Sequence, residues 1–574
     1  MKFQKTSFVI AIIVLFSFVT EAGFTQDTSP IKHLITQYRA DQGALSRKYA
    51  VNISEQHFQR FQDFYQNWQQ KLDDIDFGNL TQAQKVDYIL FKNEIDRSLY
   101  FLNERENDIE AISKYLPAPD AIIAFINRRR VGTSVNGQDI ATDFAEWSAE
   151  ITTKQQQLEE DGYLTKWEAR DLSRALRRYR SAIEEAYGFY FGYDPDFTWW
   201  VEEPFKKLKA DFEKYEKFAA EHFDEDAHED DGSGIVGNPI GEEEINRRLR
   251  FEMISYSPQE LIDIANKQFT WTEQEMLKAS RELGYGDDWK AALEAVKTTY
   301  VAEGEQPALV KDLAEEAVGF LEERNLVTIP ELAKETWRMV MLSPEYQKIA
   351  PFFLGGETVR IAYPTNTMTH DEKMMSMRGN NPHFSKAVVH HELIPGHHLQ
   401  QFMNQRYATH RRMFSTPFWT EGWALYWEMV LWNKGFPNNP EDKIGMLYWR
   451  MHRCARIVFS LNYHLGNWSP QQSIDYLVDK VGHEYANAEA EVRRSFEGNY
   501  GPLYQIAYMT GAMQFYSLRL QLVESGEMDE KEFHDAILHN NSIPVAMVKT
   551  LLTGEELSEN YTPNWDFGDY IDGI

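Results

Sequence analysis

Cysteine is almost absent from this sequence: Cys454 is the single thiol among 574 residues. One cysteine excludes an internal disulfide and a cysteine-rich metal site. A bound metal would therefore depend on histidine and carboxylate ligands. Cys454 stands in a segment with helical apolar spacing, residues 449–461, so we expect it to be a small buried core residue.

Basic charge is also scarce. The chain has 59 Lys and Arg residues against 89 Asp and Glu, which gives a formal net charge of −30. Binding to nucleic acid needs a basic surface that neutralises phosphates, so this class of partner is excluded. With 43% hydrophobic and 14% aromatic residues, the chain still has enough apolar side chains to fold as a globular protein.

Long hydrophobic runs are missing except at the N-terminus. There, Lys2 and Lys5 precede an apolar run from Phe8 to Val19, which is too short to cross a bilayer comfortably. The small residues around Ala22 are typical of a signal-peptide cleavage site, and no cysteine for a lipoprotein anchor lies near it. We therefore expect a signal peptide at 1–22, export to the periplasm or the medium, and no membrane span in the mature chain.

Alternating β patterns are rare, and most of the chain has the apolar spacing of helices. Thr81–Gln84 has the pattern of a capping box at a helix start, and apolar residues then recur every three or four positions. The same spacing predicts further helices over residues 155–190, 307–325 and 332–342. The fold class we expect is mainly α.

One short segment favours a strand. Residues 358–363 are rich in β-branched and aromatic side chains and lie between a glycine pair and Pro364. Such a strand could bind an extended peptide by strand addition, with Tyr363 as a candidate substrate contact. A purely structural strand is the alternative.

An acidic, glycine-rich stretch divides the chain. Residues 221–243 contain an acidic run from Asp224 to Asp231 and several glycines, which predicts a loop. We use it as a soft boundary between an N-terminal helical part, 23–235, and a C-terminal part, 236–574, which holds the candidate metal site. The whole of 23–574 can also be interpreted as one continuous domain.

The most informative stretch contains four histidines and a glutamate, Glu392, within residues 390–398. Its apolar neighbours indicate a buried helix, where ionisable groups are unfavourable unless they are paired or bind a metal. We therefore favour a metal site over a packed histidine cluster. Histidine ligands with an adjacent glutamate as general base are typical of Zn²⁺ peptidases, so we predict Zn²⁺ as cofactor and Glu392 as the base.

The spacing of the histidines departs from the common zinc motif H-E-x-x-H, because Pro395 stands four residues after His391. On an undisturbed helix, His391 and His397 would point about 120° apart. Pro395 and Gly396 favour a kink or bulge that would bring the two together. We predict His391 and His397 as ligands, with His398 as a substitute for His397.

A third ligand should come from another helix. Glu421 lies among large aromatic residues, where an unpaired carboxylate is unfavourable. We predict that it completes the site, and three protein ligands leave an open position for water, as in catalytic zinc sites. Glu428 shares the same helix face and either orients a ligand histidine or is an ordinary surface residue.

The run from His391 to Gln400, followed by residues 420–424, resembles the bacterial domain-of-unknown-function 885 family. Weaker resemblance extends across most of the mature chain, including residues 237–241 and Arg494. The family is similar to helical gluzincin peptidases. This resemblance implies a large helical shell around a deep channel, with the same three zinc ligands and the same glutamate base.

The resemblance also implies a source for the donor that a tetrahedral oxyanion needs besides the metal. Tyr508 and His464 are the candidates, and Tyr500 and Tyr504 compete for the role. A serine and an asparagine, at positions 460 and 462, stand where the family carries an acidic residue before the histidine. The role of His464 therefore stays open.

The function we expect is that of a zinc-dependent peptidase that hydrolyses short peptides, with Glu392 taking a proton from a metal-activated water. A carboxylate of the peptide substrate would suit an arginine, and Arg494 and Arg519 are the candidates. Two alternatives are a catalytically inactive peptide-binding protein of the same fold and a hydrolase of a non-peptide amide.

Overall fold

The computed structural model describes residues 30–224, 231–347, 353, 355–498 and 500–570. The expected signal peptide, 1–22, and most of the acidic run lie outside these residues. Within them the protein is mainly helical, as predicted, with one small two-stranded parallel sheet. None of the described helices combines the length and the apolar character needed to cross a membrane.

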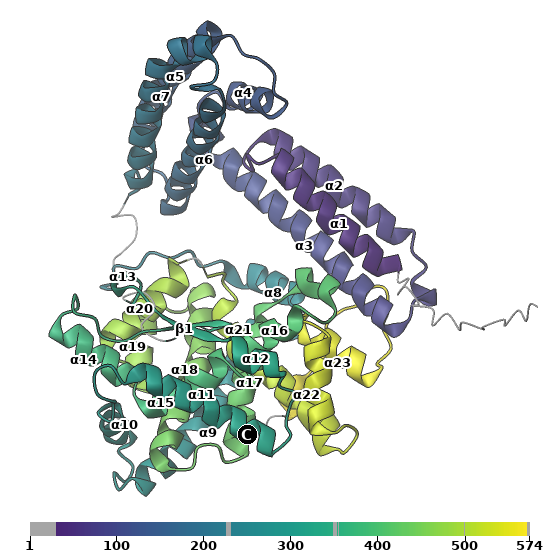
Figure 1. The fold of residues 1–574 in the computed structure, drawn as a ribbon, viewed down its shortest axis with the longest axis vertical. Helices are drawn as coiled ribbons and strands as arrows, with labels where there is room; N and C mark the ends of the chain where they lie inside the picture. Colours follow the sequence, from purple (N-terminus) through teal and green to yellow (C-terminus); the bar gives the residue numbers. More distant parts are fainter. Residues whose placement is uncertain (1–29, 225–230, 348–352, 354, 499, 571–574) are drawn as a thin grey trace, which may run out of the picture.

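Three long helices open the described chain and lie along one another at the upper right of Figure 1. The predicted capping box is confirmed, because the Thr81 side chain accepts a hydrogen bond from the Gln84 N–H at the start of the third helix. Tyr38 packs edge to face against Trp68 and Phe91. Most buried residues of these helices belong to one continuous hydrophobic core with the C-terminal helices, while Phe58, Ile109 and Ile112 belong to a second cluster. Their bounds are α1 (Pro30–Lys48), α2 (Glu55–Asp73) and α3 (Gln82–Ile112).

The next four helices form a bundle at the top of Figure 1, and their buried residues make a second hydrophobic cluster. The helical spacing over residues 155–190 is confirmed as two helices. The first ends before Gly162, which has a φ of 91°, and Thr165 starts the second with another capping box. The bounds are α4 (Pro119–Arg130), α5 (Gly137–Asp161), α6 (Lys166–Tyr190) and α7 (Pro195–Glu221).

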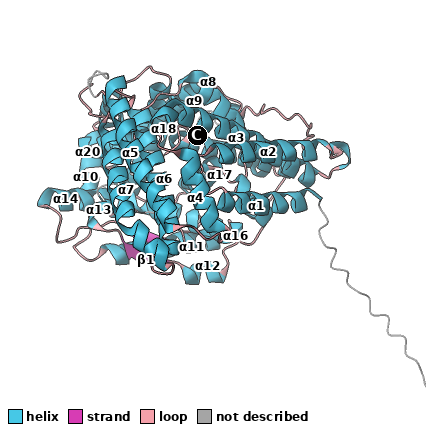
Figure 2. Ribbon diagram, turned by 90° about the horizontal axis from the view of Figure 1, so that it is seen from above, coloured by secondary structure: helices cyan, strands magenta, loops and turns pink. Residues whose placement is uncertain are grey.

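The remaining helices form the body that carries the candidate site, coloured teal to yellow in Figure 1. Seen from above in Figure 2, the molecule is almost entirely helical, with a short strand at one edge. The helix expected at 307–325 is confirmed, and the first helix of the body begins at Gly241, inside the expected loop. The bounds are α8 (Gly241–Phe251), α9 (Pro258–Glu282), α10 (Trp289–Lys297), α11 (Gln306–Glu323), α12 (Glu331–Thr336), α13 (Pro344–Gln347), α14 (His370–Gly379), α15 (Pro382–Glu392), α16 (His397–Asn404), α17 (Pro417–Asn433), α18 (Pro440–His464), α19 (Pro470–Tyr476), α20 (Tyr485–Phe496), α21 (Tyr504–Arg519), α22 (Glu530–His539) and α23 (Val545–Thr553).

The helix predicted for residues 332–342 is wrong in its second half. α12 ends at Thr336, and Trp337 has an extended backbone with φ −68° and ψ 148°. The following residues form β1 (Arg338–Met341), which pairs in parallel with β2 (Thr358–Ile361), the predicted strand. Local apolar spacing does not reveal this pairing, because each residue of β1 pairs with one that lies 20 positions later in the sequence, and such tertiary contacts override local propensity.

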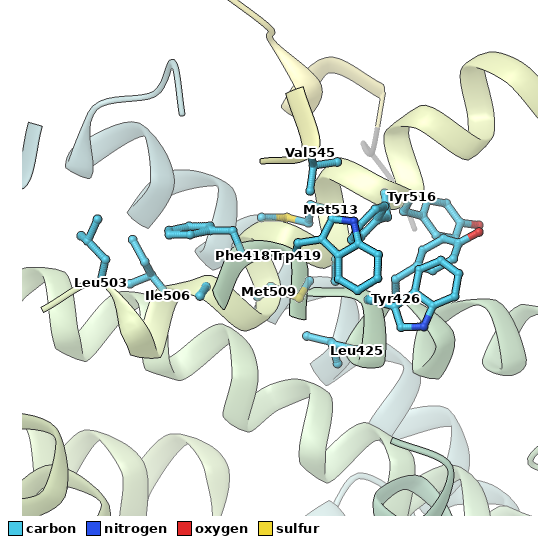
Figure 3. Packing of buried hydrophobic residues seen from close by; sticks show 14 of the residues in the cluster. Phe418, Trp419, Leu425, Tyr426, Leu503, Ile506, Met509, Met513, Tyr516 and Val545 are labelled. Carbon is cyan, nitrogen blue, oxygen red and sulfur yellow. The ribbon is translucent and has the colours of Figure 1, made fainter. Parts of the chain in front are cut away.

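Helices α17, α18 and α21 form the packed centre that positions the site. Figure 3 shows apolar side chains of α17 and α21 packed together, with Val545 of α23 beside them. α17 and α21 cross closely, because a Cβ on Gly511 would lie 1.8 Å from the carbonyl oxygen of Phe418, and one on Gly422 would lie 2.6 Å from the backbone of Gly511. Cys454 of α18 is fully buried, as predicted.

Candidate metal centre

A helix break lies in the middle of the histidine-rich stretch. α15 ends at Glu392 and α16 starts at His397, and the Gly396 N–H donates to the His390 carbonyl at 3.0 Å. A Cβ on Gly396 would lie 1.8 Å from the His391 carbonyl oxygen, so this turn has room for glycine alone. The break sets the rings of His391 and His397 4.9 Å apart, centroid to centroid.

Glu421, early in α17, completes a cluster of three residues. Its Oε2 lies 3.2 Å from His397 Nε2 and 3.7 Å from His391 Nε2. One possible ligand atom from each residue lies within 4.8 Å of the others, and Glu421 Oε2 is buried without a hydrogen-bond partner. Two imidazole nitrogens and a carboxylate oxygen grouped in this way fit a zinc ion, whose bonds to such atoms are about 2.0–2.2 Å long.

Electrostatic interactions couple the three groups. Burial by itself would raise the pKa of Glu421, but the imidazoles of His397 and His391 hold it well below its ordinary value. Burial would lower the pKa of His391, whereas Glu421 and Glu428 raise it to about 9. At neutral pH the metal-free cluster therefore holds a proton on His391, and metal binding must displace that proton.

The two imidazoles are held from the side opposite to Glu421. Nδ1 of His391 lies 2.8 Å from Oε1 of Glu428, which is itself buried. Nδ1 of His397 lies 2.7 Å from the side-chain amide of Gln400. Each ring thus directs its Nε2 towards Glu421. Of the two roles that the sequence left open for Glu428, the structure places it in the orienting one.

Glu392, the candidate base, is the last residue of α15 and lines the same cavity as the cluster. Its carbonyl accepts a hydrogen bond of 3.1 Å from the Gly356 N–H, so the chain that leads into β2 lies directly against it. Burial raises the pKa of Glu392. A raised pKa suits a carboxylate that must accept a proton and then return it near neutral pH.

The cavity has a volume of about 690 Å³, a size that accommodates a small ligand such as a short peptide. Tyr504 and Tyr508 of α21 line it. Tyr504 donates to Glu421 Oε1 at 2.6 Å, and Tyr508 donates to the Tyr504 hydroxyl at 3.4 Å. The Tyr508 ring is stacked 6.3 Å from that of His391. Burial raises the pKa of both tyrosines, so both remain protonated donors.

Two candidates taken from the sequence lie away from this cavity. His464, at the end of α18, is buried near the Phe496 ring, and Arg519 is paired with Glu530 at 2.7 Å. Within the described chain, neither side chain lines the cavity. Both residues lie on helices, and which face of a helix meets the site depends on how the helices cross, which residue spacing does not specify.

Two further candidates also point elsewhere. Tyr363, just after β2, packs against a small hydrophobic cluster that includes Val359 and Ile361, and the described lining of the cavity does not include it. His398 places its Nε2 2.7 Å from the Ala333 carbonyl oxygen. Adjacent residues on α16 project in different directions, so the His397 side chain contacts Glu421, whereas the His398 side chain contacts the backbone of α12.

Sequence reasoning missed two arginines of α18. Arg453 and Arg456 line the cavity, together with the predicted Arg494 of α20. Their spacing of three residues puts them on one helix face, which was an available signal. However, Arg450 has the same spacing from Arg453, and only the packing distinguishes the residues that face the cavity.

The chain belongs to the family described as a bacterial protein of unknown function, DUF885, which matches residues 38–552. The resemblance expected from the histidine motif is thereby confirmed. No curated protein matches the chain.

Two solved structures have a similar fold. One is a candidate lipoprotein of unknown function from Shewanella oneidensis, with 17% identity and a TM-score of 0.66, covering 91% of this chain and 99% of that chain. The other is a candidate lipoprotein from Colwellia psychrerythraea, with 18% identity and a TM-score of 0.59, covering 92% and 98%. At such identities the likeness shows the fold alone.

Proposed function

We propose that this protein is a zinc-dependent peptidase that hydrolyses short peptides. The observation that carries the proposal is the convergence of His391, His397 and Glu421 beside Glu392 in one cavity. Glu421 Oε2 makes no hydrogen bond and lies next to two imidazole nitrogens, so a cation bound there would satisfy all three atoms together. The three residues would hold the ion and leave a position open for water or substrate.

The chemistry then divides among the residues of the cavity. A zinc ion bound here supplies a Lewis acid that polarises the substrate carbonyl and lowers the pKa of a water. Glu392 takes the proton of the attacking water and returns it to the leaving amine. Tyr508 is the donor for the developing oxyanion. Tyr504 already donates to Glu421, so its role is to position that carboxylate.

The strand β2 offers a place for the peptide backbone. Arg360 of β2 and Gly355, which precedes the strand, line the cavity, and the adjoining Gly356 is bonded to the carbonyl of Glu392. In the described part of the chain, the sheet order β1–β2 leaves one edge of β2 without a neighbouring strand. An extended peptide that adds to this edge would run along the cavity wall beside the base.

The test is digestion of a peptide library by purified, zinc-loaded mature protein, followed by mass spectrometry. We expect cleavage by the wild type and a loss of about 100- to 10,000-fold in Glu392→Gln, because the amide cannot accept the proton. The zinc content of Glu392→Gln should be unchanged, whereas His391→Ala should lose zinc. Near-normal turnover in Glu392→Gln would rule out the general-base role.

The two alternatives make different predictions in the same assay. If the zinc-loaded wild type cleaves no peptide, the site belongs to a peptide-binding protein or to a hydrolase of a non-peptide amide. Removal of the metal by a chelator, followed by restoration with Zn²⁺, distinguishes the peptide-binding protein from the amide hydrolase. Only a hydrolase would lose and regain turnover of an amide substrate, while a binding protein would show none in either state.

We also propose that the protein is exported and associated with the cell envelope. The N-terminal pattern that ends near Ala22 supports export, and both similar structures come from proteins described as candidate lipoproteins. Fractionation of expressing cells and N-terminal sequencing of the product test this. A chain that keeps its first 22 residues in the cytoplasmic fraction would contradict it.

A further inference from the structure

α18 presents two arginines, Arg453 and Arg456, to the cavity from one face of the helix. Their guanidinium carbons lie 4.7 and 4.6 Å from the centre of the Tyr508 ring. Arg494 of α20 lines the same cavity. Two permanently charged guanidinium groups thus lie beside the candidate oxyanion donor, and a third lines the same cavity.

A single carboxylate, that of Glu491, pairs with this group of arginines in the described part of the chain. Glu491 lies 2.7 Å from Arg456 Nε and also pairs with Arg494. Arg453 has no ion-pair partner among the described residues, and its guanidinium lies 5.4 Å from the centre of the Trp449 ring. Glu428 and Glu421 interact with Arg453 electrostatically, but neither forms a direct ion pair with it, so Arg453 is the member of the group without a paired carboxylate.

The unpaired donors are buried. Arg453 is 8% exposed. Its Nε, the Nη1 of Arg456 and the Nε of Arg494 all lack a hydrogen-bond partner. A buried cation with unsatisfied donors is strongly unfavourable, so an anion that enters the cavity would stabilise this arrangement. Buried arginines that line a cavity and lack hydrogen-bond partners mark a candidate ligand site.

The distance between the Arg453 guanidinium and the histidine cluster limits how far the anion can lie from a peptide bond held at that cluster. The Tyr508 ring lies 6.3 Å from the His391 ring and 4.7 Å from the Arg453 guanidinium, so the guanidinium is at most 6.3 plus 4.7, or 11.0 Å, from the His391 ring. An extended peptide advances by roughly 3.3–3.6 Å per residue. A carboxylate one or two residues beyond a peptide bond held at the cluster therefore reaches Arg453.

We propose that Arg453, with Arg456 beside it, binds a carboxylate of the peptide substrate, and that this carboxylate is the free C-terminus, so that the protein removes one or two residues from that end. The inference rests on the proposed peptidase function. A guanidinium binds a carboxylate through two parallel hydrogen bonds, and the neighbouring aromatic rings of Trp449 and Tyr508 attract its positive charge. An acidic side chain of the substrate would supply the same chemistry.

Calorimetry tests the carboxylate site without turnover. The probes are trialanine and trialanine amide, and the protein is the zinc-loaded mature chain carrying Glu392→Gln. We expect the free acid to bind about 10- to 100-fold more tightly, the usual range for hydrogen bonds between charged groups. Adding Arg453→Gln should make the two affinities equal. Equal affinities without that substitution would overturn the proposal, whether or not the protein is a peptidase.

A third probe, the amide of Ala-Ala-Asp, distinguishes the two sources of a carboxylate. It carries an acidic side chain but no free C-terminus. We expect it to bind as weakly as trialanine amide. If it binds as tightly as trialanine, the site recognises an acidic side chain and the C-terminal assignment is overturned.

Kinetics on otherwise wild-type protein complete the test. The ratio of kcat/KM for trialanine to that for its amide should be about 10 to 100 and should fall towards one in Arg453→Gln. Arg453→Lys keeps the charge but loses the planar fork, so its ratio should be intermediate. Arg450→Lys is the matched control, because Arg450 is a buried arginine of the same helix that bonds to Gln268 outside the described cavity lining, and it should keep the wild-type ratio.

The two proposals fail in different ways. If no peptide is cleaved, but the acid still binds more tightly than the amide and the difference depends on Arg453, the carboxylate site stands and the peptidase proposal fails. If both probes are cleaved at the same rate by the wild type, the peptidase stands and the carboxylate site is overturned.

Discussion

One neighbouring side chain orients each imidazole ring of the cluster. Glu428 bonds to His391 Nδ1, and Gln400 lies against His397 Nδ1, so both Nε2 atoms point towards the Glu421 carboxylate. A carboxylate such as Glu428, which accepts the Nδ1–H of the ring, fixes the tautomer and raises the basicity of the imidazole, whereas the Gln400 amide fixes only the orientation of its ring. The cluster is therefore prearranged before any metal binds.

Replacing Glu428 by glutamine should weaken zinc binding about 10- to 100-fold, because the amide has the same size but cannot support the imidazole with a negative charge. Competition against a chromogenic chelator measures this affinity. Glu527→Gln, which makes the same change at an exposed position, is the control and should bind zinc like the wild type. Unchanged affinity in Glu428→Gln would contradict the orienting role.

At the scale of helices, the close crossing of α17 and α21 connects the fold to the site. Glu421 directly precedes Gly422, and Tyr508 lies three residues before Gly511, on the other helix of the crossing. The absence of side chains at the two glycines lets the helix backbones meet. This contact brings the tyrosines of α21 within reach of Glu421.

Gly511→Ala should lower the free energy of unfolding by about 1–3 kcal/mol, because the added methyl group would clash with the carbonyl of Phe418 and force the helices apart. Urea denaturation measures the change. Gly319→Ala, within α11, is the matched control: its Cβ would meet no atom within 4 Å, and it should gain about 0.5–1 kcal/mol. A Gly511→Ala protein as stable as the wild type would show that the crossing can relax.

At the scale of the whole molecule, the body keeps several histidines neutral by burial. Burial lowers the pKa of His464 to about 4, and it does the same to His534, although a hydrogen bond from the ring to the Leu326 carbonyl opposes the shift. Below pH 6.5 these two histidines bind protons in the unfolded chain, whereas in the folded protein they stay neutral until the pH approaches 4. Their contribution to stability is complete above pH 6.5 and is lost as the pH falls towards 4.

Acidification should therefore destabilise the protein by up to about 3 kcal/mol for each of these two histidines by pH 4, at about 1.4 kcal/mol per pKa unit. Urea midpoints between pH 7.5 and 4.5 measure the effect. Replacing His464 by glutamine should make the urea midpoint fall less steeply with pH between pH 6.5 and 4.5. If the urea midpoint of that variant falls as steeply as that of the wild type, groups other than His464 cause the acid destabilisation.

The sequence by itself predicted the fold class, and it identified the residues that converge at the candidate metal centre. Helical spacing and capping patterns are local, so the helices near Thr81 and over 307–325 followed from them. Residue types indicated the candidate ligands, because burying histidines, or a carboxylate among aromatic residues such as Glu421, is unfavourable unless these groups are paired. The break at Pro395-Gly396 could also be anticipated, since a proline inside a helical pattern removes a backbone donor and an adjacent glycine permits unusual backbone angles.

Only the tertiary structure decided which of these side chains meet. It placed His397 rather than His398 in the cluster, removed His464 and Arg519 from the cavity, and brought in Arg453. It also turned the end of a predicted helix into β1, through pairing with a strand further along the chain. The physical reason is the same in each case. Spacing along a helix specifies which residues share a face, but the partner of that face is set by close packing between elements distant in sequence, such as the crossing of α17 and α21.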